Sequence, residues 1–322
     1  KDIFYPTDKG QIVDTPDELE SKKKFCFELG AKYQIDNRFE SIGGCAANVA
    51  VGLSRLGIET ECYTKIGDDY IGKWIKEELE KNGVSTTLVE IENNCKSDLS
   101  AIISDKNSGE HTIFFNRDAN EKLEIIPEKI AKCEWFFISA LNGNWKDNLE
   151  KIIKTAKEKN IKIIMNPGQA NIKEDCQKVV EAIKNSELIM ANKDEIIEIV
   201  NKIGKFSKEE LDDELFLMKK IIELGSKAVS LTDGIRGAWG FDGENFYRVN
   251  TIGKNPLETT GAGDAFSSGF MAAYLSGETL EECLKWGIAN SGNSLNFYGA
   301  VEGLLKKEEI LEKIKEIKIE RV

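Results

Sequence analysis

Residues 258–266, ETTGAGDAF, decide the fold and the chemistry expected of this chain. Gly261 and Gly263 remove side chains where a turn enters a helical pattern. The backbone N–H groups of Ala262, Gly263 and Asp264 are therefore expected to point outward from the N-terminus of a helix. Such a helix end carries roughly half a positive charge and binds anions. The stretch predicts a phosphate-binding loop.

Asp264 stands in the middle of this expected anion site, where its charge would repel a phosphate. The arrangement is explained if the carboxylate accepts a proton from a hydroxyl that attacks the phosphate, which makes Asp264 the catalytic base. The alternative is an ordinary helix start with Thr260 as its cap. The sequence has no G-x-x-x-x-G-K-[ST] loop, no third glycine of a dinucleotide fingerprint and no H-R-D of protein kinases.

Away from this stretch, short apolar runs alternate with amphipathic segments rich in lysine and glutamate. Strands are expected at 135–140, 161–165, 188–191 and 228–231, and helices at 148–159, 176–185 and 209–224. Buried strands that alternate with helices predict a mostly parallel sheet covered on both faces. Ligands of such sheets bind at the carboxyl ends of the strands.

Two stretches, 25–42 and 97–115, show the polar and apolar alternation of antiparallel hairpins instead. They predict a small β-sheet that stands off the core as a lid, formed by roughly 9–42 and 97–118. The whole chain, 1–322, is expected to form a single domain.

The composition limits the partners and the location of the protein. The 322 residues are 41% hydrophobic and 31% charged, with a net charge of −12. This charge argues against nucleic acids and anionic membranes as partners. There is no apolar run of about 18 residues and no signal-peptide pattern at the N-terminus, so a cytoplasmic protein is expected.

The cysteine and histidine counts limit the chemistry. Seven scattered cysteines, none in a C-x-x-C pair, indicate reduced thiols rather than disulfides or a zinc site. His111 is the only histidine, so a Ser-His-Asp triad is nearly excluded. A carboxylate is therefore the expected general base.

Two segments together resemble the ribokinase-like (PfkB-type) carbohydrate kinases. Residues 258–266 resemble the family's second signature, and residues 43–57, GGCAANVAVGLSRLG, resemble its first. The order and separation of the signatures match, so the resemblance covers nearly the whole chain. It implies a ribokinase-like three-layer α/β/α sandwich with a β lid, which transfers the γ-phosphate of ATP to a hydroxyl of a sugar or sugar-like substrate.

The resemblance also assigns substrate-binding residues. Gly43 and Gly44 allow the backbone to approach a ligand, and Asn48 offers a donor and an acceptor to vicinal hydroxyls. The alternative for this segment is a turn that leads into a packed helix. Asp2 matches a substrate-binding aspartate that follows the family's first strand. No apolar strand precedes Asp2, so residues before Lys1 or a shortened chain are expected.

Further family elements concern the nucleotide and metal ions. Asn192 and Glu195 resemble an N-x-x-E element that holds Mg²⁺ through water, although an ordinary helix cap is the alternative. The turn at 232–237 resembles a nucleotide-binding T-x-G-x-x-G element, with a simple hairpin as its alternative. The nucleotide-binding residues that the resemblance implies are Asn192, Thr232, Gly234, Gly237 and Asn290.

A monovalent cation such as K⁺ is implied near Glu258 and residues 299–300. Glutamate stands where the family usually has aspartate, and this departure leaves dependence on K⁺ open. Glu195 and Glu258 are thus the two expected metal-binding carboxylates.

The residues leave several functions in competition. A nucleoside kinase or a phosphosugar kinase has the same fold, and Lys32, Arg38 and Arg117 are candidate cations for a phosphosugar. A non-catalytic sugar-binding protein is disfavoured by Asp264. A nicotinamide oxidoreductase is disfavoured by the incomplete dinucleotide fingerprint. A homodimer through the lid is the expected assembly.

Overall fold

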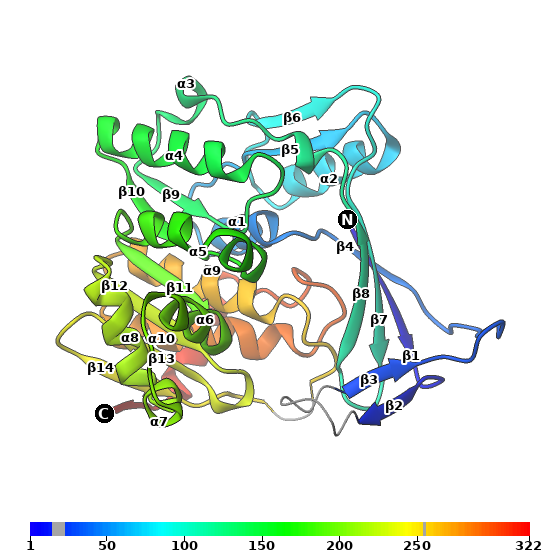
Figure 1. The fold of residues 1–322 in the computed structure, drawn as a ribbon. Coiled ribbons are helices and arrows are strands. Elements are labelled where there is room, and N and C mark those ends of the chain that lie inside the picture. The colour runs from blue at the N-terminus through cyan, green and yellow to red at the C-terminus, as the bar shows by residue number, and fades with distance from the viewer. Residues whose placement is uncertain (15–22, 254–255) are drawn as a thin grey trace.

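The computed structural model describes residues 1–14, 23–253 and 256–322, which form a large layered part and a smaller sheet at its side (Figure 1). The large part is built on a seven-stranded sheet in the order β15-β14-β13-β12-β11-β10-β9. Its strands are β9 (Trp135–Ile138), β10 (Lys162–Met165), β11 (Leu188–Asn192), β12 (Ala228–Thr232), β13 (Ala238–Phe241), β14 (Phe246–Val249) and β15 (Ile319–Arg321).

The predicted parallel arrangement holds for β9 to β12. From β12 onward the strands pair antiparallel, which makes the sheet mixed. The reason is the short turn at 233–237, which is long enough for a hairpin but too short for the crossover that a parallel strand requires.

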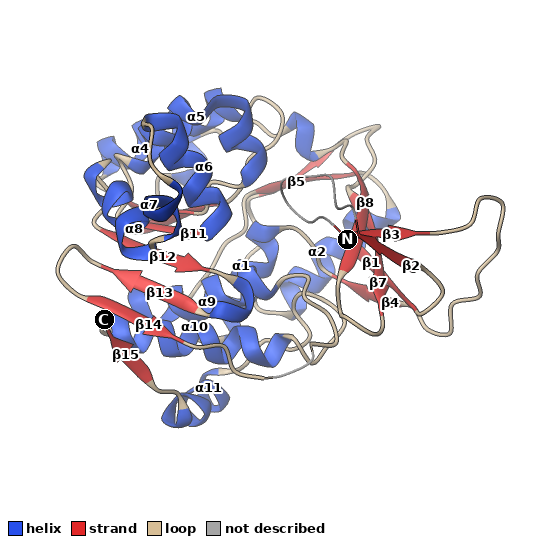
Figure 2. Cartoon of the chain, turned by 60° about the horizontal axis from the view of Figure 1, so that its bottom comes forward, coloured by secondary structure: helices blue, strands red, loops and turns tan. Residues whose placement is uncertain are grey.

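Side chains of the parallel strands alternate between two hydrophobic layers. Ile163 and Met165 pack into one buried cluster, whereas Ile164 packs into the other. Helices that contribute to the first cluster are α4 (Trp145–Lys159), α5 (Gln169–Ile183), α6 (Lys193–Ile203) and α8 (Glu214–Glu223). Helices on the opposite face are α1 (Cys45–Arg55), α9 (Ala262–Leu275) and α10 (Leu280–Ser294) (Figure 2). The predicted three-layer α/β/α sandwich is confirmed.

One predicted helix is divided. The segment 209–224 forms two helices, α7 (Lys208–Asp212) and α8, because Asp213 has an extended backbone and caps the second one. The carboxylate of Asp213 accepts a hydrogen bond of 3.0 Å from the N–H of Phe216. Aspartate favours such caps over helix interiors.

The smaller sheet has the order β4-β1-β7-β8, and we call it the lid sheet. Its strands are β1 (Asp2–Thr7), β4 (Phe39–Ser41), β7 (Leu99–Asp105) and β8 (His111–Asn116). Strand β1 lies in its centre, parallel to β7 and antiparallel to β4, although the sequence analysis placed the start of the lid near residue 9. Asp2 is the first residue of β1. Strands β2 (Gln11–Asp14) and β3 (Lys23–Cys26) form a separate hairpin.

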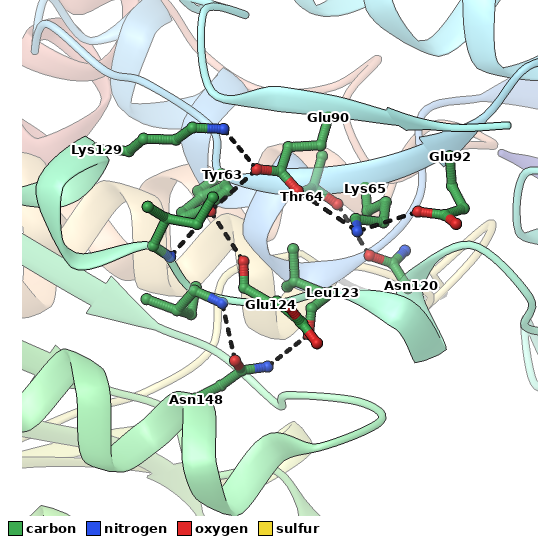
Figure 3. Close-up of polar contacts among 12 residues, drawn as sticks. Tyr63, Thr64, Lys65, Glu90, Glu92, Asn120, Leu123, Glu124, Lys129 and Asn148 are labelled. Atoms are coloured by element: carbon green, nitrogen blue, oxygen red, sulfur yellow. Dashed lines mark hydrogen bonds and ion pairs between the residues drawn. The ribbon is translucent and has the colours of Figure 1, made fainter.

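Strands β5 (Thr64–Gly67) and β6 (Val89–Glu92) form a two-stranded parallel sheet. It lies between the lid sheet and α4 of the layered part (Figure 1). Figure 3 shows polar contacts around it: Lys65 of β5 pairs with Glu90 of β6 within the sheet, and Glu90 also pairs with Lys129 of α3 at 2.7 Å. Below them, the amide of Asn148 on α4 donates to the carbonyl of Leu123 at 2.7 Å. The remaining short elements are α2 (Tyr70–Lys81), η1 (Asn120–Lys122), α3 (Pro127–Ile130), η2 (Gly234–Arg236), α11 (Lys307–Lys313) and η3 (Ile314–Glu316).

Candidate active site

The N-terminus of α9 differs from the sequence prediction at one of the three N–H groups that were expected to point outward. Gly261 caps the helix with φ 81°, and a Cβ at this position would lie 2.5 Å from the Cβ of Ala300. The N–H of Ala262 donates to the carbonyl of Thr259, so it belongs to the turn. Among the described residues, no partner is found for the N–H groups of Gly263 and Asp264. A Cβ on Gly263 would meet no atom within 4 Å, which leaves space in front of these two donors.

Asp264 is held by α1, which comes from the other end of the sequence. Its Oδ2 accepts a hydrogen bond of 2.7 Å from Nδ2 of Asn48. Burial raises the pKa of Asp264, and the hydrogen bonds from Asn48 and from the Cys45 thiol only partly oppose this. The carboxylate is thus fixed in orientation and more basic than a solvated aspartate.

Asp2 lies against the glycines of the first signature. A Cβ on Gly43 would lie 2.2 Å from the carboxylate of Asp2, so only glycine permits this approach. Burial raises the pKa of Asp2, and the hydrogen bond with Ser100 only partly opposes this. The negative charge of Asp2 also contributes to the raised pKa of Asp264. The two carboxylates therefore lie close enough for their charges to interact.

Asn48 keeps one polar atom free. Gly44 (φ 93°) caps α1, which brings Asn48 to the first turn of that helix. Asn48 is 4% exposed, and in the described part of the chain its Oδ1 has no hydrogen-bond partner. A buried orphan acceptor costs about 1–3 kcal/mol unless something donates to it. The hydroxyl of a bound molecule would satisfy it.

A cavity of about 110 Å³ lies between the ends of the parallel strands and α9. Its polar lining comes from three strands or the residues that follow them and from the first turns of α6 and α9: Asn166, Asn192, Glu195, Ser230, Thr232, Gly263 and Ser267. Ser230 is fully buried, and its hydroxyl has no partner within the described ranges. The cavity is therefore a polar site next to the bare N–H groups.

Asn192 and Glu195 form a capping box at the start of α6. The side chain of Asn192 accepts from the N–H of Glu195 at 2.8 Å, and Oε2 of Glu195 accepts from the N–H of Asn192 at 3.0 Å. Burial is the main reason that the pKa of Glu195 is raised. The capping alternative is thus present, and the same two side chains also line the cavity.

The oxygen lining of the cavity fits a hydrated Mg²⁺. Within residues 1–14, 23–253 and 256–322 there is no group of three or more His, Cys, Asp or Glu side chains that could hold a metal ion. Mg²⁺ commonly keeps several waters and uses one or two carboxylates together with substrate phosphates. Glu195 and the orphan hydroxyl of Ser230 meet that requirement.

The turn at 233–237 forms the hairpin between β12 and β13. Gly237 has φ 98°, and a Cβ there would lie 2.0 Å from the carbonyl oxygen of Val249. Gly234 has φ 46° and faces open space. Thr232 lines the cavity, whereas these two glycines lie outside its lining. The structure therefore brings only Thr232 of this element to the cavity.

Comparison with known proteins identifies the family of this chain. The family model of the pfkB family carbohydrate kinases matches residues 22–306. The chain belongs to this family. The predicted carbohydrate kinase class is confirmed with it.

The relatives of this kinase are named for several different substrates. It is 27% identical to the ATP-dependent 6-phosphofructokinase of Thermoanaerobacterium thermosaccharolyticum, over 86% of each chain. It is 27% identical to the ribokinase of Haemophilus influenzae, over 88% of this chain and 89% of the relative. Its fold matches the nucleoside kinase of Burkholderia thailandensis in complex with inosine with a TM-score of 0.78 at 15% identity, covering 98% and 94% of the chains. None of the helices that the structure describes has the length and apolarity needed to cross a membrane.

Asn290 occupies a structural position in this kinase. It is fully buried on α10, where its Nδ2 donates to the carbonyl of Ala265 and to Oγ of Ser268. Its Oδ1 accepts from the N–H of Leu305 at 2.8 Å. These bonds occupy the amide atoms of Asn290 that would be needed to bind a nucleotide, so the expected nucleotide contact is wrong. Asn290 instead links α9, α10 and the segment before α11.

Glu258 also differs from its expected role as a metal ligand. It is 1% exposed, and its carboxylate accepts hydrogen bonds from its own loop and from the lid sheet. Burial favours a higher pKa, but the bonds from His111, Ser104 and Thr260 outweigh it and hold the pKa of Glu258 below its ordinary value. The carboxylate is ionised and already satisfied by protein donors.

Two residues at the site were missed by the sequence analysis. Cys45 is the first residue of α1, and its thiol lies beside Asp264. Cys45 lies three residues before Asn48, and residues three apart share one face of a helix. This spacing could have placed Cys45 at the site. His111 reaches Glu258 from β8, and its position in a lid strand gave no sign of this contact.

Proposed function

We propose that this kinase transfers the γ-phosphate of ATP to a hydroxyl of a sugar or sugar-like alcohol, with Asp264 as the catalytic base. The observation that carries this proposal is the placement of Asp264. Its carboxylate is oriented by Asn48 and stands beside the two unpartnered N–H groups of the α9 N-terminus. An oriented base next to an anion site is the arrangement that phosphoryl transfer to an alcohol requires.

The acceptor would bind between Asp2 and Asn48. The free Oδ1 of Asn48 would accept a hydrogen bond from one hydroxyl, and the Asp2 carboxylate would accept from another. The reacting hydroxyl would donate to Asp264. Its proton moves to the carboxylate as the bond from oxygen to phosphorus forms and the bond to the ADP leaving group breaks.

The γ-phosphate would lie against the N–H groups of Gly263 and Asp264. These donors are fixed before the reaction and stabilise charge on the transferring group without reorganisation. Mg²⁺ held with the phosphates beside Glu195 would neutralise further negative charge during the transfer. Asn192 and Thr232 line the same cavity and are the proposed contacts of the nucleotide phosphates.

Gly234 and Gly237 are proposed to allow the rest of the nucleotide to approach the backbone at the turn after β12. Gly234 supports this, because a Cβ there would face open space. The close approach of Gly237 to Val249 is enough to explain why glycine stands there, so Gly237 adds no separate support to this proposal.

The acceptor class has two candidates. A sugar or sugar phosphate is favoured by the 27% identity to a 6-phosphofructokinase over most of the chain. A nucleoside is the alternative, favoured by the fold of the nucleoside kinase that binds inosine. Of the candidate cations for a sugar phosphate, Arg117 donates to Asn142 at 2.6 Å and Arg38 pairs with Glu40 at 3.0 Å.

The test is a screen for ADP release with Mg²⁺-ATP and pentoses, hexoses, sugar phosphates and nucleosides. We expect one class to raise ADP release well above the rate with ATP alone, and the phosphorylated product to be seen by mass spectrometry. ADP release that no acceptor stimulates would contradict the proposal. Stimulation by nucleosides alone would show that the protein is a nucleoside kinase and not a sugar kinase.

We also propose a homodimer through the lid sheet. Strand β8 is the edge of that sheet, and it exposes Ile113, Phe114 and Phe115 at 40%, 64% and 61%. Exposed apolar side chains on an unpaired edge favour association with another copy of the same edge.

A further inference from the structure

A closed hydrogen-bonded cluster connects the lid sheet to the phosphate-binding loop. Its centre is the carboxylate of Glu258. Oε1 accepts from the N–H groups of Thr259 at 2.9 Å and Thr260 at 3.0 Å, and from the Thr260 hydroxyl at 2.8 Å. The same oxygen lies 3.0 Å from Nδ1 of His111, and Oε2 accepts from the hydroxyl of Ser104.

This cluster surrounds the Glu258 carboxylate, where a monovalent cation was expected, with protein donors. Four donors converge on Oε1, which has about two lone-pair sites, and Ser104 donates to Oε2. The side chain is also sealed from solvent, since the relative exposure of Glu258 is 1%. A K⁺ ion held by this carboxylate therefore does not fit the site.

The cluster joins segments that are distant in the sequence. Ser104 lies on β7 and His111 on β8, whereas Glu258 lies three residues before Gly261. The hydroxyl of Thr259 adds a bond of 3.3 Å to the carbonyl of Gly109 in the β7–β8 turn. The lid sheet thus fixes the backbone that leads directly into the bare N–H groups of α9.

We propose that His111 is a positioning residue that takes the place of the expected cation. Its Nδ1–H holds Glu258, and through Glu258 the phosphate-binding loop, so that nucleotide binding does not depend on K⁺. Because Glu258 is ionised and accepts at this oxygen, Nδ1 is the nitrogen that carries the proton. The inference rests on the proposed function, since it assumes that the loop binds the phosphates of a nucleotide.

The first test uses the protein without a histidine tag and a fluorescent N-methylanthraniloyl derivative of ADP, with Mg²⁺. Its Kd and the thermal unfolding midpoint are measured in KCl and in N-methylglucamine chloride at equal ionic strength. We expect both values to agree between the two salts. His111 is the only histidine, so its Nδ1–H gives a single imidazole NMR signal, expected to exchange slowly and to keep its position when K⁺ is added.

The second test compares substitutions at His111. His111→Leu removes the donor and is expected to weaken binding of the ADP derivative about tenfold in N-methylglucamine chloride. His111→Asn places an amide donor near the position of Nδ1 and is expected to restore most of the affinity. Thr112→Ala, an exposed neighbour on the same strand, is the matched control and is expected to bind as the wild type does.

Two results would overturn the proposal. One is a wild-type affinity for the ADP derivative that rises tenfold or more with K⁺. The other is a folded His111→Leu protein with unchanged affinity. If His111→Leu does not fold, the wild-type salt comparison and the His111→Asn variant decide. A complete lack of binding of the ADP derivative in any salt would instead refute the proposed function, so the two failures are distinguishable.

Discussion

As the proposed base, Asp264 is expected to support activity and to lower stability. Its pKa is raised in the folded protein, so the folded state binds the proton more tightly than the unfolded state does. The free energy of unfolding therefore falls as the pH rises from the unfolded-state pKa through the raised folded-state pKa. At neutral pH the ionised carboxylate costs stability.

Asp264→Asn separates the two effects. We expect kcat to fall by about 10²–10⁴-fold, because the base is lost. We expect the thermal unfolding midpoint at neutral pH to rise, since an amide carries no buried charge and still accepts from Asn48. Steady-state ADP release and calorimetry measure the two quantities. A kcat close to that of the wild type would remove Asp264 from the role of base.

The same pKa gives a prediction for the pH dependence. The base must be deprotonated, so kcat/KM is expected to decline at acid pH with a midpoint above the ordinary aspartate value of about 3.8. Asp2, whose pKa is also raised, adds a second acid limb if it accepts from the acceptor. The profile is measured from about pH 4 to pH 8, with saturating ATP and with protein checked for folding at each pH. A flat profile over this range would contradict the assignment.

At the residue scale, the sequence located the side chains that lie in its two signatures. Asp264, Gly43 and Asn48 could be placed together because each signature is a local turn into a helix. Asn290 could not be assigned correctly, because its role depends on whether its amide meets protein or ligand. Two hydrogen bonds that Asn290 donates to α9 and one that it accepts from Leu305 decide that, and none of them is encoded locally.

At the scale of elements, the start of α9 allows a matched pair of substitutions. Gly261→Ala would force a Cβ against Ala300 at a positive φ, so a loss of about 1–3 kcal/mol in the free energy of unfolding is expected. Gly263→Ala puts its Cβ in open space on a helix, so a gain of about 0.5–1 kcal/mol is expected. Chemical denaturation measures both values.

Activity is expected to separate the same pair. Although Gly263→Ala is expected to be the more stable protein, its methyl group would occupy space where the phosphate is proposed to bind, and we expect KM for ATP to rise about tenfold or more. Unchanged ATP kinetics in a folded Gly263→Ala protein would place the phosphate elsewhere.

The elements show where periodicity succeeds and where it fails. The four parallel strands were located because β-strands buried on both faces form short continuous apolar runs. The break at Asp213 was missed because the apolar pattern continues across it, and only the capping bond to Phe216 divides the helix. Strand β1 was missed because its few residues, DIFYPT, contain a proline and two polar ends.

At the scale of the whole molecule, the lid sheet determines the expected assembly. We expect light scattering to give a molar mass about twice the 36.0 kDa of one chain. Phe114→Lys on the exposed edge strand is expected to give the monomer mass, because a charge on an association surface is costly to bury. Tyr70→Lys, at an exposed aromatic residue of α2, is the control. A monomeric wild type at micromolar concentration would exclude a stable dimer.

The contacts between the lid sheet and the layered part could not be predicted from the sequence. His111 and Glu258 are 147 positions apart, and their meeting depends on how two sheets dock. Ser41 and Glu302, bonded at 2.9 Å across the same boundary, are a second example. Each residue alone is an ordinary polar side chain of a strand or loop, so no local pattern marks it.

The central position of β1 has a consequence for biosynthesis. Its parallel neighbour β7 is made about a hundred residues after β1, and α9, which carries Asp264, begins about 160 residues after β7. Until β7 is made, β1 has only the three residues of β4 to pair with in the lid sheet. The surroundings of Asp2 are therefore completed only after distant segments of the chain have been translated.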